Sequence, residues 1–217
     1  MAVWGSSPLS RRMSILPAVK QRGDGSMSSI KWSESLKRLF PCCLVFLFLV
    51  ACDNPPWAKI SLIEAAERGE LAAVKAAVAA GADINQLRDG GQTALLVATI
   101  NKQVGIVSYL LDKGANPELA DVSGQTPIFW AAENKHPEMV KTLIEHGANV
   151  NAKTGAGEVA LTRAVAHHNV SIVQLLMDAG ADPNIKSNWG YTPLSMATEG
   201  NYAEMLQILN RVTAPTP

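Results

Sequence analysis

The chain has 217 residues and a formal net charge of zero, but its charges are unevenly distributed. Residues 1–51 contain 7 Lys or Arg and 2 Asp or Glu, whereas residues 52–217 contain 12 and 17, which gives the second part a net charge of −5. Since binding to phosphates depends on clustered Lys and Arg, this acidic part is not expected to bind nucleic acid. The three cysteines are Cys42, Cys43 and Cys52, so the rest of the chain has no residues for a disulfide framework or a thiolate metal site.

Residues 1–51 have the features of a targeting segment. Residues 1–26 show no hydrophobic period, and we interpret them as a disordered or untranslated extension, with Met27 as a candidate start. Residues 27–51 then combine three basic residues with an apolar run at positions 41–51. This run is shorter than the ~20 residues that a membrane-spanning helix needs, so the pattern predicts a signal peptide.

The signal peptide ends in Leu-Val-Ala-Cys, which resembles the lipobox of bacterial lipoproteins. In that family the cysteine is acylated and becomes the first residue of the mature protein. The resemblance implies that Cys52 carries a lipid and anchors the protein in a bilayer, on the periplasmic side of the bacterial cell envelope. Asp53 resembles an inner-membrane retention signal, which favours the inner over the outer membrane, and residues 52–56 form a short tether. The alternative is a buried apolar strand that ends in a free cysteine.

A pattern with a period of 33 residues runs through residues 57–213. Its landmarks are a turn glycine, a small helix residue, a Gly-Ala pair and a valine, and two copies carry Thr-Pro soon after the glycine. The series are Gly91, Gly124, Gly157 and Gly190; Ala65, Ala98, Ala131, Ala164 and Ala197; Gly81, Gly114, Gly147 and Gly180, each followed by Ala; and Val74, Val107, Val140 and Val173. This pattern resembles the ankyrin-repeat family. The resemblance implies an all-α repeat solenoid of about five repeats, each with two helices and a β-turn finger, and a short tail at residues 214–217.

The residues of one copy, 121–153, also predict its local structure. Thr126 and Thr192 stand where a side-chain oxygen can cap a helix N-terminus, and each precedes a proline at the first helical position. Pro137 opens a second helix in the same copy, and Gly147 ends it because glycine accepts the left-handed backbone of a C-cap. Two such short helices are unstable alone, so each repeat must bury its apolar face against its neighbours.

Two repeats depart from the pattern. The first, residues 57–86, lacks the turn, and Trp57 either covers its open end or contacts a partner. In the fourth, residues 153–185, Val159 and Ala160 replace Thr-Pro, so we expect the helix cap to be lost and this repeat to open first. Non-glycine residues stand at four turn positions where we expect left-handed backbone, namely Lys102, Lys135, His168 and Asn201.

No motif for catalysis or metal binding stands out. His167 and His168 are adjacent, so they do not share a helix face as ligands four residues apart would. The sequence has no glycine-rich phosphate loop and no nucleophile or zinc-protease motif. We therefore expect no enzymatic activity, no cofactor and no metal.

In the ankyrin family the finger tips and the first helices line a concave binding groove. Carried over by position, the candidate protein-binding residues are Asp89, Gln92, Asn101, Gln125, Glu133, Asn134, Glu158, Asn188, Trp189 and Tyr191. Trp189 and Tyr191 are the aromatic candidates for a binding hot spot. The alternative for Trp189 is that it lies flat on the last repeat and shields it from water. Trp130 stands where the family carries Leu, so we expect it in the core.

These resemblances imply a membrane-anchored periplasmic adaptor that binds one protein partner through its concave face. The alternative is an immunity protein that neutralises a secreted toxin or lipase effector. A neighbouring gene for a secreted lipase or nuclease would favour the immunity protein, whereas an isolated gene would favour the adaptor.

Overall fold

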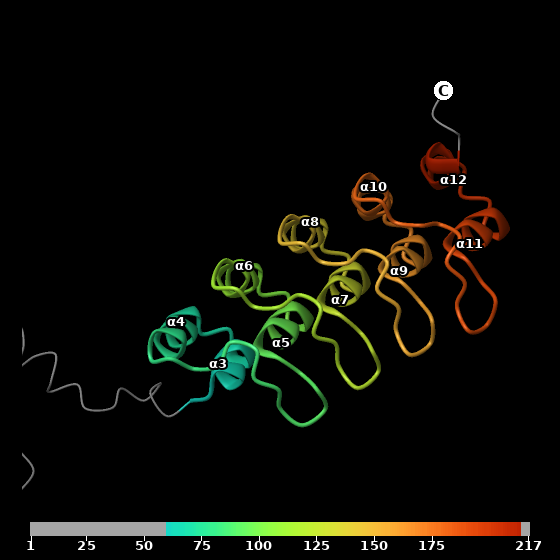
Figure 1. Cartoon of the computed structure of the whole chain (residues 1–217). Helices are drawn as coiled ribbons and strands as arrows, with labels where there is room; N and C mark the ends of the chain where they lie inside the picture. Colours follow the sequence, from blue (N-terminus) through green and yellow to red (C-terminus); the bar gives the residue numbers. More distant parts are fainter. Residues whose placement is uncertain (1–59, 214–217) are drawn as a thin grey trace, which may run out of the picture. The chain divides into compact units, whose positions relative to one another are not determined.

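The computed structural model describes residues 60–213, which contain ten α-helices in five pairs and no β-strand. The first helices of the pairs are α3 (Leu62–Arg68), α5 (Ala94–Ile100), α7 (Pro127–Glu133), α9 (Ala160–Ala166) and α11 (Pro193–Glu199). The second helices are α4 (Leu71–Ala79), α6 (Val104–Asp112), α8 (Pro137–Glu145), α10 (Val170–Asp178) and α12 (Ala203–Leu209), and a short 3-10 helix, η2 (Asn210–Thr213), follows. Figure 1 shows two adjacent rows of helices, with long loops on the side of the first helices. The described residues thus form the expected all-α repeat solenoid.

Several predictions concern residues outside the described range. The signal peptide, Cys52, the tether, Trp57 and the tail at residues 214–217 are among them, and they stay predictions. Within residues 60–213, no helix combines the length and the apolar character that crossing a bilayer requires.

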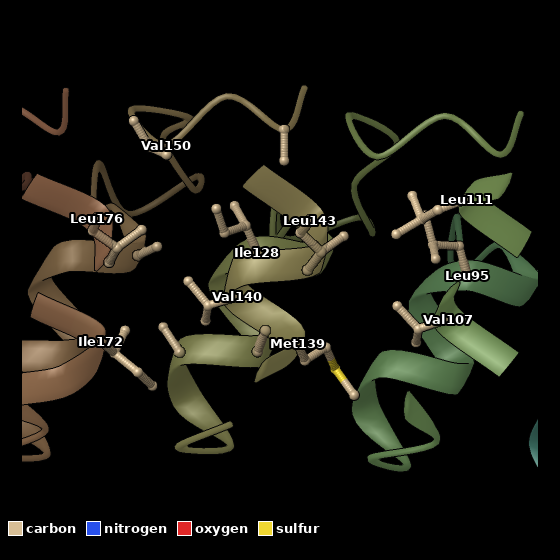
Figure 2. Close-up of a cluster of buried hydrophobic side chains, with 14 of the residues drawn as sticks. Leu95, Val107, Leu111, Ile128, Met139, Val140, Leu143, Val150, Ile172 and Leu176 are labelled. Atoms are coloured by element: carbon tan, nitrogen blue, oxygen red, sulfur yellow. The ribbon is translucent and has the colours of Figure 1, made fainter. Parts of the chain in front are cut away.

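The core is a ladder of apolar side chains that repeats from one helix pair to the next. Val74, Val107, Val140 and Val173 are all fully buried, as are the five alanines of the first helices, Ala65, Ala98, Ala131, Ala164 and Ala197. Figure 2 shows how Val107, Val140 and Ile172 of successive second helices lie in one layer of the stack. Each helix pair therefore gains stability from the repeats that neighbour it, as a repeat architecture requires.

Of the two helix caps that the sequence predicted, the one at Thr192 forms and the one at Thr126 does not. The hydroxyl oxygens of Ser61, Thr93 and Thr192 accept backbone N–H groups at 3.2, 3.1 and 2.9 Å. Thr126 was expected to do the same, and this prediction is wrong, because its buried hydroxyl makes no hydrogen bond. Its backbone is extended as in a cap (φ −83°, ψ 164°), so the difference lies in the rotation of the side chain. Val159 provides no side-chain cap, as expected.

The turn after each first helix has left-handed backbone, as the sequence predicted. Gly69 has φ +76° there, and the equivalent residues Lys102, Lys135, His168 and Asn201 have φ between +54° and +60°. L-residues pay a conformational cost in this region because the β-carbon approaches the backbone. Four of the five described repeats therefore carry a turn that glycine would occupy more easily.

Hydrogen bonds between repeats hold the stack in register. In the loops after the second helices, the backbone N–H groups of Asn116, Asn149 and Asp182 donate to side chains one repeat earlier, namely Asn85, Glu118 and Asn151, at 2.7–2.9 Å. The long loops are joined as well, through backbone bonds from Val122 to Gly90, from Gly155 to Ser123 and from Asn188 to Ala156. The loops are therefore positioned by their neighbours, so side chains at their tips have a defined arrangement.

Candidate functional site

The candidate site is the surface made by the long loops and the exposed side of the first helices. We call the loop segments 87–92, 120–125, 153–158 and 186–191 the fingers, and this surface the finger face. All of the strongly exposed large hydrophobic side chains within residues 60–211 lie on fingers: Leu87 (55% exposed), Val122 (82%), Trp189 (66%) and Tyr191 (50%). Exposing apolar side chains to water is unfavourable in free energy, and exposed apolar groups on one face of a protein are typical of interaction surfaces.

Three of the sequence-predicted candidates hold the repeats together. The side-chain amide of Asn101 donates to the carbonyl oxygen of Glu67 at 3.1 Å, and the amide of Asn134 donates to those of Thr99 and Ile100, also at 3.1 Å. These oxygens belong to the C-terminal ends of the preceding first helices, which have unsatisfied carbonyl groups. In the last finger, the amide of Asn188 donates to the carbonyl oxygen of Gly155 at 3.0 Å. The spacing of 33 residues between Asn101 and Asn134 was the sequence signal for this structural role.

Gln92 is tied to the first helix of the preceding repeat through Arg88, which the sequence analysis did not single out. The Arg88 guanidinium donates to Oε1 of Gln92 at 2.7 and 3.1 Å and to Oε2 of Glu67 at 2.8 Å. Asp89, at the tip of this finger, is exposed, whereas Gln125 is half-buried in the next finger. The first finger is thus fixed to α3 while its tip stays accessible.

Glu133 and Glu158 are brought together by Arg163 in the middle of the finger face. Arg163 donates to Oε2 of Glu158, and its Nε lies 3.6 Å from Oε2 of Glu133. Nε2 of His167 lies 3.1 Å from the same Glu133 oxygen. The guanidinium carbon of Arg163 also lies 5.5 Å from the centre of the Phe129 ring, a cation–π distance. These side chains are only partly exposed, so the cluster joins the third and fourth repeats.

Trp130 is not in the core, and that prediction is wrong. It is half-buried on the finger face, and its indole Nε1 lies 3.4 Å from Oδ2 of Asp121, to which it donates. Its position matches Arg163 and Met196 one and two repeats later, which also face this surface. An indole N–H needs a hydrogen-bond acceptor. The carboxylate of Asp121 on the finger supplies this acceptor, whereas the apolar layer between the helices does not.

The last finger forms an aromatic corner with α11 and the start of α12. Trp189 and Tyr191 are exposed there, and Tyr202 is half-buried with its ring edge-on to His168, 4.1 Å between ring centres. A hollow of about 470 Å³ opens between them, and its lining also includes Met196, Glu158 and Glu199. Trp189 is 66% exposed, so little of its surface is buried against the last repeat.

Comparison with known proteins agrees with this architecture. Residues 62–154 match the family model described as ankyrin repeats (3 copies), and residues 143–197 match that described as ankyrin repeats (many copies). A putative ankyrin repeat-containing protein of Treponema pallidum (strain Nichols) is 41% identical over 61 residues, which cover 28% of this chain and 20% of that protein.

Mitochondrial disaggregases match over part of the same region. The Homo sapiens protein is 37% identical over 82 residues, which cover 37% of this chain and 12% of its own length. The Bos taurus protein is 35% identical over 94 residues, which cover 42% of this chain and 14% of its own length. The chain thus spans about an eighth of the disaggregases, and the likeness concerns the repeats alone.

Proposed function

Because residues 62–197 are ankyrin repeats, which indicate a role in protein–protein interaction, we propose that this chain is a membrane-anchored periplasmic adaptor that binds a protein partner through its finger face. The observation that carries the proposal is the distribution of exposed apolar side chains. Leu87, Val122, Trp189 and Tyr191 all lie on fingers, and the rest of the described surface has no equally exposed large hydrophobic residue. Aromatic anchors on preordered loops bind well because little conformational freedom is lost on association.

The rigidity of the fingers supports the same proposal. Backbone hydrogen bonds join neighbouring fingers, and the amide of Asn188 links the last finger to the one before it. Asn101 and Asn134 hold the first helices at fixed spacing beneath them. These residues support the binding surface, whereas Asp89, Trp189 and Tyr191 remain accessible to a partner.

The proposed anchor is an acyl chain on Cys52. The support is the order of basic residues, a short apolar run, a small residue and the cysteine in residues 27–52. Asp53 favours retention at the inner membrane. Residues 52–56 contain two prolines and form a short, stiff tether between the bilayer and the repeats.

Site-specific photo-crosslinking in intact cells tests the proposal. A photoreactive residue at Val122 or Trp189 should give a discrete adduct with a protein of the cell envelope. The matched control is Lys141, whose side chain is 64% exposed on the second helix α8, away from the fingers. An adduct of equal yield at Lys141, or none at either finger position, would contradict the proposal. The identity of the captured protein separates an adaptor from an immunity protein that neutralises a toxin or lipase.

A further inference from the structure

The residues that line the hollow at the aromatic corner limit the chemical class of ligand that it can bind. Its walls are the aromatic rings of Trp189, Tyr191 and Tyr202 together with two carboxylate side chains, Glu158 and Glu199, and no Lys or Arg is among its lining residues. Glu158 is paired with Arg163, whereas Glu199 is exposed and forms no ion pair within residues 60–213. The hollow thus combines aromatic faces with an uncompensated carboxylate.

A second feature of the hollow is a polar group without a partner. Ser187 lines it and is only 8% exposed, and its hydroxyl oxygen makes no hydrogen bond with any described residue. A shielded hydroxyl that lacks a partner costs free energy, and a donor in the hollow would remove that cost only if the Ser187 side chain turned towards it. An ammonium or guanidinium group carries several N–H donors and no acceptor, so it matches a site built from oxygens.

The hollow depends on the absence of a side chain at Gly200. The equivalent residues of the second, third and fourth repeats are Asn101, Asn134 and His167, whose side chains reach back to the preceding first helix. At Gly200 a β-carbon would overlap the ring of Tyr202. Glycine therefore lets the Tyr202 ring lie over the end of α11, where it forms one wall of the hollow.

We propose that this hollow binds the cationic side chain of a lysine or arginine in an exposed segment of the partner protein. The inference rests on the proposed function and names the chemistry of the partner at this site. The cation would lie against the rings of Trp189 and Tyr191, which attract positive charge through their electron-rich faces. Glu199 supplies the opposite charge, and Met196 offers an apolar wall for the methylene groups of the side chain. An acidic segment is disfavoured, since it would place its charge beside Glu158 and Glu199.

Peptide titration followed by NMR tests the inference without knowledge of the partner. The probe is a blocked pentapeptide with one lysine between glycines, and the indole N–H resonance of Trp189 is identified from a Trp189→Phe variant. The lysine peptide should move this resonance with a Kd of roughly millimolar order, as expected for a single side chain. The matched peptide with norleucine, which keeps the four-carbon chain and removes the charged nitrogen, should bind about 5-fold more weakly or worse.

Two variants complete the test. Glu199→Gln should weaken the lysine peptide by about 5-fold, whereas Glu204→Gln, a change of the same kind on α12 outside the hollow, should leave its Kd unchanged. Equal binding of the lysine and norleucine peptides would make the hollow an apolar site and overturn the inference. Stronger binding of a glutamate peptide, or no shift of the Trp189 resonance with any peptide, would also overturn it.

The titration and the crosslinking experiment test separate claims, so either one can fail while the other succeeds. If a protein is captured at Val122 and Trp189 but the lysine peptide does not bind, the adaptor function stands and the cation site is wrong. If the lysine peptide binds with the expected charge dependence but no protein is captured, the cation site stands and the adaptor function is wrong.

Discussion

The side-chain amide nitrogen of Asn134 lies 3.1 Å from the carbonyl oxygen of Ile100, across the junction between the second and third repeats. Ile100 ends α5, where backbone carbonyl groups lack partners within the helix. A second bond from the same amide to Thr99 makes this a two-point contact. The contact gives Asn134 a role in the stability of this junction.

Replacing Asn134 with Ala should therefore destabilise the protein by about 1–2 kcal/mol, since the Ile100 carbonyl group loses its side-chain donor and the Thr99 carbonyl group keeps only the backbone N–H of Lys102. Partner affinity of the folded protein should stay unchanged. Chemical denaturation gives the stability, and Asp89→Ala is the control because Asp89 is exposed at a finger tip. Unchanged stability in Asn134→Ala together with weaker partner binding would show that Asn134 contacts the partner.

Lys135 tests the cost of left-handed backbone in the turns. Its φ is +59°, so Lys135→Gly should stabilise the protein by up to ~1 kcal/mol. The matched control is Lys141→Gly, the same chemical change within α8, which should destabilise by about 1 kcal/mol because glycine is a poor helix former. Thermal unfolding of the two variants should show melting temperatures that move in opposite directions. A loss of stability in both would mean that the Lys135 side chain contributes more than its backbone costs.

The fourth repeat should gain stability from a restored cap. Val159 begins α9 with extended backbone and no side-chain cap, and Ala160 occupies the first helical position. Changing Val159→Thr and Ala160→Pro together should stabilise the protein by about 1 kcal/mol and raise its melting temperature. Hydrogen exchange on the unchanged protein should show earlier opening in residues 153–185 than in the second repeat, whose first helix is capped by Thr93. The opposite order of protection would show that the Arg163 cluster stabilises the fourth repeat by more than the missing cap destabilises it.

The 33-residue period predicted the helix pairs because each landmark has a backbone or packing reason. Gly69 at one turn position was enough to expect left-handed backbone at Lys102 and His168, and the structure confirms both. The errors concern side-chain directions. Thr126 and Thr192 share a backbone conformation but only Thr192 caps its helix, and Trp130 faces a finger instead of the core. These outcomes depend on rotamers and on contacts between neighbouring repeats, which the pattern of one repeat does not contain.

The same reason explains what was missed in the candidate site. The sequence placed Glu133 and Glu158 on the binding face, but their contact with Arg163 depends on how the third and fourth repeats stack. The amide roles of Asn101 and Asn134 likewise exist only across a repeat junction. Arg163 stands in the same 33-residue register as Trp130, and a charged residue there was the signal that this register can face the surface.

The lipid anchor has its own test. Cys52→Ser removes the thiol that acylation needs, so the protein should leave the membrane fraction or remain uncleaved. Metabolic labelling with a fatty acid should mark the unchanged protein and not the variant, and Cys43→Ser should keep the label. Absence of label on the unchanged protein would remove the lipid anchor from the proposed function.

The Trp189→Ala variant tests whether the aromatic corner contributes to partner binding or to stability. The side chain is 66% exposed at the tip of the last finger, so Trp189→Ala removes little buried surface and should leave the melting temperature nearly unchanged. If the indole is an interface anchor, the same change should weaken partner binding by ~2 kcal/mol or more, since truncated aromatic hot spots have effects of this size. Tyr109→Ala is the stability control, because that ring is half-buried on α6 near Lys75 and Lys113, away from the fingers. It should lower the melting temperature and spare the affinity of the folded protein. A Trp189→Ala protein with reduced stability and full affinity would make the indole a structural shield and move the hot spot elsewhere on the finger face.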